Sequence, residues 1–334
     1  MVTIQQIAKE TGFSPSTVSI VLNGKGDARA ISPATQQAIR EAAKRMNYRP
    51  SISARALRGG SANEKMLGLY FSADYRSAMM NRFTNGLWAY PLCQNPDLNI
   101  IITPYQVGSL SHNFELKSLN RFHGVILCNM DAADMEYLTA QHPPMPAVLY
   151  NRTLPGYASV TVNNAELGRI PAEVFAAHGR RTAAILCGAN PFPGMDSRVQ
   201  AFVDYCRQYG MQVLPPVECR ELCEGGYQGI QQLYAAGQKF DCLFCAADVL
   251  AFGALRALQE KGVCIPEQVE VISIGNGDPQ QAEYAWPSLS QVQVPIEAMA
   301  QECFRLVMNQ IEHREQQITS SELPVLYIAR ESTK

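Results

Sequence analysis

TIQQIAKETGFSPSTVSIVLN, residues Thr3–Asn23, is the stretch that decides how this chain is organised. It predicts two short helices joined by a tight turn. Thr3 and Gln6 have the spacing of a capping box at the start of the first helix. Gly12 stands where that helix must end in a left-handed residue. Ser14 is a good cap for the second helix, and Pro15 suits its first turn.

The second predicted helix has one apolar face and one polar face. Val18, Val21 and Leu22 recur at helical spacing and form its buried stripe. The other face carries short side chains that would fit a DNA major groove, namely Ser16, Thr17, Ser19 and Ile20. In a helix-turn-helix the second helix lies in that groove, and its first residues contact base edges. The structural alternative is a helical hairpin packed against the rest of the chain.

Charge is distributed unevenly along the 334 residues. Residues 1–60 hold nine lysines or arginines and three acids, whereas the whole chain has a net charge of −2. The head therefore carries +6 and the remainder −8. A basic head on an acidic body favours a polyanionic partner at the head alone.

A third helix and a linker complete the first 60 residues. Ser32-Pro33 repeats the cap-then-proline start. The apolar residues that follow at helical spacing are Ala34, Ala38, Ile39, Ala42, Ala43 and Met46. Further on, Leu57 lies between Arg55 and Arg58. An apolar residue flanked by arginines suits a wedge in the DNA minor groove with the arginines on phosphates. A plain linker is the alternative.

From Met66 onward, short apolar runs alternate with amphipathic helices. The expected strands lie near 67–71, 100–103, 125–128, 147–150, 160–162, 184–187, 212–214, 242–246 and 270–274. The expected helices lie near 77–92, 132–141, 165–178, 197–209, 227–236, 249–261 and 295–311. This alternation is typical of parallel sheets covered on both faces, and its two series indicate two α/β lobes. Ligands bind such sheets at the carboxyl ends of the strands, so a cleft between the lobes is the expected site.

Several protein classes are excluded by missing patterns. No apolar run approaches the about 20 residues of a membrane span, and the first residues do not resemble a signal peptide. Cys242 and Cys245 form a C-x-x-C within an expected strand, where residues three apart point to opposite faces. Buried reduced thiols in a cytoplasmic protein are therefore expected. No phosphate loop, nucleophile elbow or H-E-x-x-H is present, so we expect no enzyme, cofactor or metal.

Head, linker and two-lobed body together resemble the LacI/GalR family of bacterial transcription regulators. In the head the resemblance rests on Thr3-Ile4, Ile7-Ala8, Gly12-Phe-Ser14, Ser16–Ser19 and Leu22-Asn23, and in the linker on residues 47–50 and 54–58. In the body it rests on residues 244–258 and 262–272 and on Ser197–Phe202. The resemblance covers essentially the whole chain.

The resemblance implies a helix-turn-helix head at 1–48 and a hinge helix with linker at 49–61. It implies a body like a periplasmic binding protein, with an N-lobe at 62–161 and 292–321 and a C-lobe at 162–291 and 322–334. It also implies a cytoplasmic homodimer that binds palindromic operator DNA, as a repressor in most members, under control of a small molecule. The DNA-binding residues it implies are Thr3, Ser14, Pro15, Ser16, Thr17, Ser19, Ile20, Asn23, Tyr48, Arg49, Ser53, Ala54, Leu57 and Arg58.

The effector-binding residues implied by the resemblance are Asp74, Tyr75, Arg152, Arg198, Glu221, Ala247, Asp248, Asn276 and Ile296. Two positions depart from the set that usually grips a sugar: Ala247 stands in place of asparagine, and Gly275 in place of aspartate. Arg152 and Arg198 could together grip a carboxylate or phosphate. The alternative is that one or both form structural salt bridges. The expected effector is a carbohydrate, a sugar phosphate or a related metabolite, and a protein co-regulator is a further candidate partner.

The competing hypothesis is a two-lobed sensor or solute-binding protein with no direct role on DNA. The missing signal peptide and the +6 head argue against it.

Overall fold

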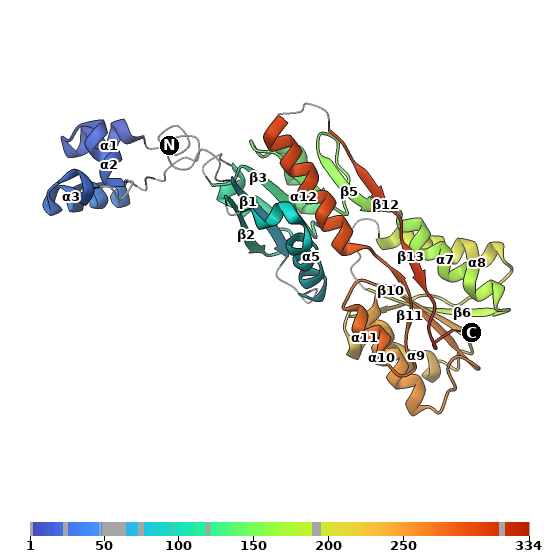
Figure 1. Cartoon of the computed structure of the whole chain (residues 1–334). Helices are drawn as coiled ribbons and strands as arrows, with labels where there is room; N and C mark the ends of the chain where they lie inside the picture. The colour runs from blue at the N-terminus through green and yellow to red at the C-terminus, as the bar shows by residue number, and fades with distance from the viewer. Residues whose placement is uncertain are drawn as a thin grey trace. The chain divides into compact units, whose positions relative to one another are not determined.

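The computed structural model, shown in Figure 1, describes residues 3–22, 26–46, 48, 65–72, 77–95, 97–117, 121–188, 195–313 and 318–333. It contains two compact units, a head within residues 1–63 and a body that begins at residue 64. Each unit is described by itself.

The head consists of three helices, α1 (Ile4–Thr11), α2 (Pro15–Leu22) and α3 (Pro33–Arg45), with a 3-10 turn, η1 (Asp27–Arg29), between the last two. The predicted capping box of Thr3 and Gln6 is present, and Gly12 ends α1 with a φ of 73°. Ile7, Val18 and Ile39, one from each helix, are fully buried against one another. The three predicted helices of the head are therefore confirmed.

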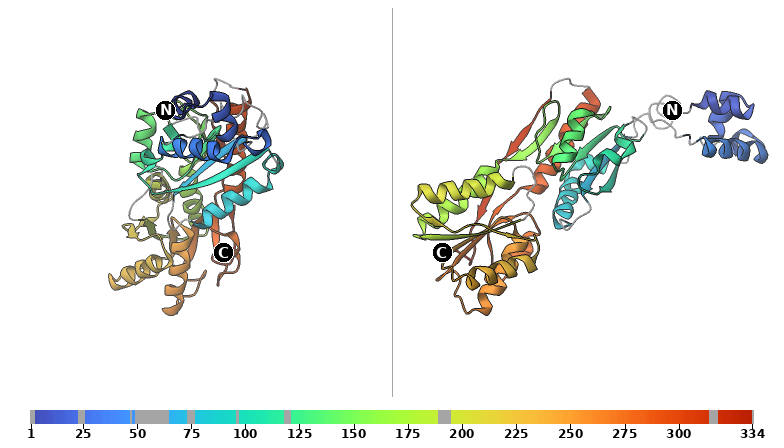
Figure 2. Two further views of the ribbon diagram at one scale, coloured as in Figure 1. Left: turned by 90° about the vertical axis from the view of Figure 1, so that its left-hand side faces the viewer. Right: turned by 180° about the vertical axis from the view of Figure 1, so that it is seen from behind.

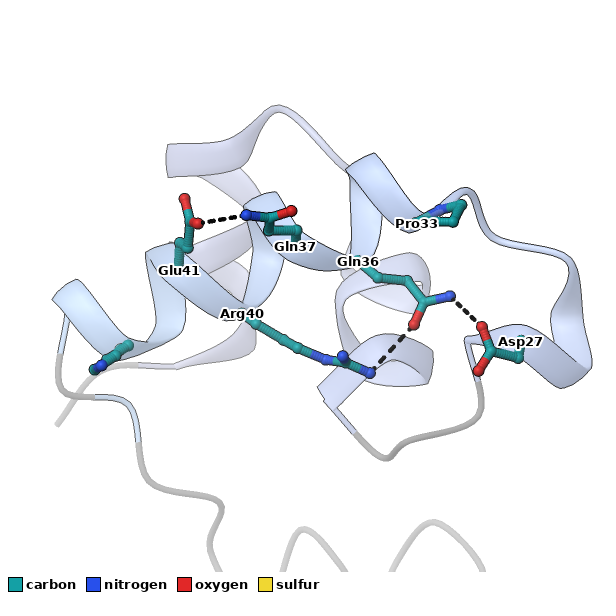
Figure 3. A pocket seen from close by; sticks show the side chains of 7 residues that line it. Asp27, Pro33, Gln36, Gln37, Arg40 and Glu41 are labelled. Carbon is teal, nitrogen blue, oxygen red and sulfur yellow. Dashed lines mark hydrogen bonds between the residues drawn. The ribbon is translucent and has the colours of Figure 1, made fainter.

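One buried position of α3 differs from the predicted stripe (Figure 3). Ala34 and Ala38 are exposed, whereas Gln36 is buried. The Gln36 amide donates to Asp27 Oδ1 and to the carbonyl of Ile31, both at 2.9 Å, and its oxygen accepts from Arg40 at 3.2 Å. A glutamine replaces an apolar residue here because it satisfies the polar groups of the preceding turn.

The N-lobe is the part of the body built on a six-stranded parallel sheet in the order β12-β5-β4-β3-β1-β2. Its strands are β1 (Lys65–Ser72), β2 (Leu98–Tyr105), β3 (Gly124–Leu127), β4 (Ala147–Tyr150), β5 (Ala158–Val162) and β12 (Ser321–Leu323). Helices α5 (Ser77–Ala89) and α12 (Ile296–His313) run side by side on one face, as Figure 1 shows. The remaining helical elements of this lobe are α6 (Ala132–Ala140) and the 3-10 turns η2 (Pro91–Gln94), η3 (Leu110–His112) and η4 (Phe114–Lys117).

The C-lobe is built on a seven-stranded sheet in the order β13-β11-β10-β9-β6-β7, with β8 paired to β6. Its strands are β6 (Thr182–Gly188), β7 (Gln212–Val213), β8 (Val217–Cys219), β9 (Cys242–Cys245), β10 (Glu270–Gly275), β11 (Ser290–Gln293) and β13 (Leu326–Ile328). Its helices are α7 (Asn164–Ala177), α8 (Met195–Gln208), α9 (Cys223–Ala235), α10 (Asp248–Glu260) and α11 (Pro279–Glu283). Figure 2 shows α7 with α8 and α9 with α10 as packed pairs on opposite faces of this sheet.

The chain passes between the two sheets three times. It leaves the first sheet after β5, returns to it through α12 after β11, and crosses again between β12 and β13. The pairing of β12 on β5 joins Ser321 to Val160, and β13 runs antiparallel to β11. Neither lobe is one continuous stretch of chain.

The predicted fold class, two mostly parallel α/β lobes behind a helix-turn-helix head, is confirmed. All nine predicted strands are present, whereas β8, β11, β12, β13 and the short α11 were not predicted as elements. Cys242 and Cys245 are both fully buried in β9. Within the described ranges no group of histidine, cysteine or acidic side chains has the arrangement of a metal site. No helix in the described part of the chain has the length and apolarity needed to cross a membrane.

Candidate DNA-binding face and ligand site

The first turn of α2 is presented to solvent. The Ser14 hydroxyl accepts a hydrogen bond from the Thr17 amide at 3.1 Å and so caps the helix. Pro15 and Ser16 are exposed, and the next predicted contacts, Thr17, Ser19 and Ile20, are half-buried. Val18 and Val21 on the opposite face are buried in the head core. The predicted polar face of this helix is thus the outward one.

The other predicted DNA-binding residues are placed less uniformly. Thr3 is exposed but engaged in the α1 cap, and Tyr48 is half-buried against the head core, with its amide donating to the Ala43 carbonyl at 2.8 Å. Six lie outside the described residues: Asn23, Arg49, Ser53, Ala54, Leu57 and Arg58.

In the body, Arg198 near the start of α8 is a buried cation. It is 5% exposed, and its Nε donates to Asn164 Oδ1 on α7 at 2.8 Å. Among the described residues its two terminal Nη groups have no hydrogen-bond partner. Burial lowers the pKa of the Arg198 guanidinium to about 10, and the negative charge of nearby Glu221 opposes that shift. Arg198 is therefore a buried cation with N–H donors that no described residue accepts.

Tyr150, at the carboxyl end of β4, marks where groups from both lobes meet. Burial raises the pKa of its phenol well above the usual value. The positive charges of Arg82 on α5 and of Arg198 on α8 act in the opposite direction. Tyr150 on an N-lobe strand thus feels the charge of a residue from α8 of the C-lobe.

Asp248, predicted to contact the effector, makes its hydrogen bonds to backbone amides of the protein itself. It is buried at the start of α10 and accepts hydrogen bonds from the Gly277 amide at 2.6 Å and the Val249 amide at 2.9 Å. Burial raises the pKa of its carboxyl, and these two amides counteract the rise. Asp248 thus fixes the turn after β10. Its neighbour Ala247 is buried and offers no polar side chain.

Arg152 and Glu221 lie at the ends of strands in different lobes. Arg152 Nε donates to the Met130 carbonyl at 2.9 Å and its Nη1 to the Asn151 carbonyl at 2.6 Å, so part of its guanidinium holds N-lobe backbone. A Cβ added at Gly188 would lie 3.2 Å from Glu221 Oε2, which places Glu221 at the carboxyl end of β6.

The remaining predicted effector residues differ in exposure. Asn276, between Gly275 and Gly277, is half-buried, and no hydrogen bond to its side chain occurs in the described ranges. Ile296 has no exposed surface and belongs to the larger hydrophobic core. Asp74 and Tyr75 lie outside the described residues.

Two residues near this site were not singled out from the sequence. Asn151 follows β4 with a φ of 52°, and its Oδ1 is buried without a hydrogen-bond partner among the described atoms. Asparagine tolerates that left-handed conformation better than most residues. An asparagine directly after a predicted strand was the one feature of the sequence that could have pointed to this position. Arg82 is an arginine in an otherwise ordinary amphipathic helix, and nothing local marks it.

Comparison with known proteins gives two family matches. The family described as "Bacterial regulatory proteins, lacI family" matches residues 3–51, and the family described as "Periplasmic binding protein-like domain" matches residues 172–333. The two matches cover the head and much of the body.

Individual relatives are distant but extend over nearly the whole chain. The probable HTH-type transcriptional repressor ExuR of Bacillus subtilis is 26% identical over 305 residues, covering 90% of this chain and 89% of that protein. The HTH-type transcriptional repressor PurR of Vibrio cholerae is 24% identical over 339 residues, covering 100% and 98%. A crystal structure of a LacI family transcription regulator from Clostridium acetobutylicum is 28% identical with a TM-score of 0.76, covering 80% of this chain and 99% of that one. The relatives are named as transcription regulators, not as enzymes.

Proposed function

Because this chain is a DNA-binding transcription repressor of the LacI family, we propose that a small molecule bound between its two lobes controls its affinity for a palindromic operator. The observation that supports DNA reading most directly is the exposed first turn of α2, with Pro15 and Ser16 outermost. These side chains offer few bidentate hydrogen bonds. The protein therefore recognises its DNA sequence through apolar contacts and DNA shape as well as through hydrogen bonds.

The proposed effector carries an anionic group. Arg198 supports this, because a buried guanidinium with two unused Nη groups is best satisfied by a carboxylate or phosphate. Arg152 contributes less, since its Nε and Nη1 already donate to backbone carbonyls. Asn276 and Asn151 offer amide groups for hydroxyls of the same ligand. A sugar acid or sugar phosphate combines these features.

The proposed assembly is a homodimer, as a palindromic operator requires. Large apolar side chains are exposed on both lobes. Trp88 at the end of α5 is 54% exposed, and Ile102 on β2, the edge strand of the N-lobe sheet, is 41% exposed. Tyr284 and Trp286 beyond α11 are 80% and 76% exposed. We propose that the second subunit covers some of these side chains.

Selection from a pool of random DNA duplexes tests the DNA-binding proposal. We expect a palindromic consensus whose binding weakens steeply with salt, because each neutralised phosphate releases counterions. Leu57→Ala should reduce affinity for the selected sequence far more than affinity for a scrambled one. Equal losses on both DNAs would remove the wedge role, and the absence of any consensus would overturn the proposal.

A thermal-shift screen of the full-length protein tests the effector proposal. Neutral sugars, sugar phosphates, sugar acids and nucleosides are compared at equal concentration. A ligand that binds only the folded state adds about 2.7 kcal/mol of stability at a hundredfold excess over its Kd. We expect stabilisation by an anionic compound and none by its neutral analogue. Stabilisation by the neutral analogue alone would contradict an anion-binding site.

A further inference from the structure

Arg82 of α5 makes hydrogen bonds to residues of both lobes. Its side chain is 6% exposed, and its Nε and Nη2 donate to the two carboxylate oxygens of Glu297 at 2.7 and 2.6 Å. Glu297 lies in the first turn of α12, the helix that packs beside α5. The fork-to-fork geometry of this pair fixes the plane of the guanidinium.

The rest of the Arg82 guanidinium faces the C-lobe. Nη1 donates to the carbonyls of Gly275 at 3.4 Å and Gly277 at 3.3 Å. Nη2 also donates to the carbonyl of Val294, at 3.1 Å, where the chain leaves β11. A single N-lobe side chain therefore holds the two C-lobe carbonyls that flank Asn276, together with the Val294 carbonyl in the segment that leaves the C-lobe sheet.

The same turn is fixed from the C-lobe side by Asp248. Its carboxylate accepts the Gly277 amide at 2.6 Å, and a Cβ added at Gly277 would lie 2.8 Å from that carboxylate. The turn that carries Asn276 is thus held by an anion of its own lobe through an N–H, and by a cation of the other lobe through two carbonyls. A movement of one lobe against the other must lengthen or break the Arg82 bonds, and the turn is then held only by Asp248, which is free to open and reform its bond to the Gly277 amide.

We propose that Arg82 is a positioning residue for the effector site: it sets the 275–277 turn from the opposite lobe and so links the orientation of Asn276 to the relation between the lobes. The link from this turn to DNA binding rests on the proposed function. The control of the turn by Arg82 does not depend on it. The Arg82 donors are already occupied by Glu297 and by backbone carbonyls, so the role proposed is positioning and not ligand binding.

The chain provides a matched control for this inference. Arg305 and Glu302, also on α12, form the same fork-to-fork pair, with Nε and Nη2 each 2.7 Å from a carboxylate oxygen. No hydrogen bond from Arg305 reaches a C-lobe carbonyl in the described part of the chain. Arg305→Met therefore removes an ion pair of the same geometry without touching the turn, although Arg305 is 43% exposed and Arg82 only 6%.

The test is hydrogen exchange of the full-length protein, free of ligand and DNA, followed at the Gly277 amide. We expect Arg82→Met to speed exchange there at least tenfold, Arg82→Lys to have an intermediate effect, and Arg305→Met to leave it unchanged. Amides of β6 report that each variant is folded. Unchanged exchange at Gly277 in Arg82→Met, or an equal rise in Arg305→Met, would overturn the inference.

A second readout tests the link to DNA binding. The selected operator duplex is titrated by fluorescence anisotropy at several salt concentrations. Arg82→Met should change its Kd at least threefold relative to Arg305→Met, with the same salt slope, because the head contacts are untouched. An operator Kd equal to that of Arg305→Met would overturn the coupling. If the wild-type protein selects no DNA sequence, the proposed function fails, and the exchange measurement still decides whether Arg82 holds the turn.

Discussion

Single charged residues decide which parts of the ligand site are available for binding and which are structural. Arg198 and Arg152 look equivalent in the sequence, since each follows a strand or begins a helix at the expected cleft. In the structure Arg152 holds carbonyls of its own lobe, whereas Arg198 retains unused donors. Asp248 similarly binds backbone amides. Partners far away in the sequence make these distinctions, namely Met130 for Arg152, Gly277 for Asp248 and Asn164 for Arg198, so the pattern around each residue could not have predicted them.

Replacing Arg198 and Arg152 should separate binding from stability. Arg198→Met removes a buried charge that has lost hydration, so the melting temperature of the free protein should stay the same or rise. The stabilisation by an anionic compound should disappear. Arg152→Met should lower the melting temperature of the free protein, because the carbonyls of Met130 and Asn151 each lose a donor. Thermal melts with and without the compound check both outcomes, and a destabilised Arg198→Met that still binds would contradict the assignment.

Glu297 predicts a pH dependence that can be measured on the same protein. Partial burial raises the pKa of its carboxyl, but hydrogen bonds from Arg82 and from its own backbone amide outweigh burial, so the pKa lies below the usual 4.5. The folded state then binds fewer protons than the unfolded state in that range. Its stabilisation is fully present above the unfolded pKa and is lost as pH falls through the folded pKa.

Glu297→Gln should accordingly cost about 1–3 kcal/mol of unfolding free energy at pH 7, because Arg82 loses a charged partner. The difference from the wild-type protein should shrink as the pH falls below about 4. Urea unfolding at pH 7 and in the acid range measures it. A difference that is independent of pH would mean that the Glu297 charge does not stabilise the fold.

Helices and strands with long regular patterns were predictable, and short or edge elements were not. The periodic apolar residues of α1, α2 and α3 and the apolar runs of β1 to β7, β9 and β10 depend on local sequence. Strands β12 and β13 have three residues each, half-buried or exposed, and form only because partners exist elsewhere in the chain. Their pairing is a tertiary effect that hydrophobic periodicity does not encode.

The contact between α5 and α12 depends on a missing side chain. A Cβ at Gly86 would lie 2.5 Å from the Glu297 carbonyl oxygen, and the Gly86 carbonyl accepts from Gln301 at 3.2 Å. Gly86→Ala should force the two helices apart and cost about 1–3 kcal/mol. The exposed neighbour Asn85→Ala is the control, and denaturant unfolding of both variants is the measurement. Equal stability of the two variants would show that the helices separate without cost.

For the whole molecule, the sequence predicted the two-lobed body and the head but not which surfaces remain uncovered. Exposure is a property of the folded chain, and Ile102 sits in an apolar run like those of the buried strands. In the structure that run is β2, the free edge of the N-lobe sheet. An exposed apolar edge strand is a surface that a second copy can cover.

Ile102→Lys should therefore weaken self-association and leave the fold intact. A lysine on an edge strand is tolerated by the monomer and is costly in an apolar interface. Sedimentation velocity should show a dimer for the wild-type protein and a larger monomer fraction for the variant at the same concentration. Thr103→Lys, on the same strand, is the comparison. An unchanged dimer in Ile102→Lys would place the interface elsewhere.

The return of β12 to the first sheet also has a consequence for synthesis of the protein. Ser321 pairs with Val160. Almost half of the chain must therefore be translated after β5 before its neighbouring strand, β12, exists. A nascent chain that has completed the head and five strands still has an open parallel edge, which is slow to pair and prone to aggregation. We expect ribosome-bound intermediates of this repressor to depend on chaperones until residue 323 has left the exit tunnel. The head, which closes its core within residues 7–43, has no such delay.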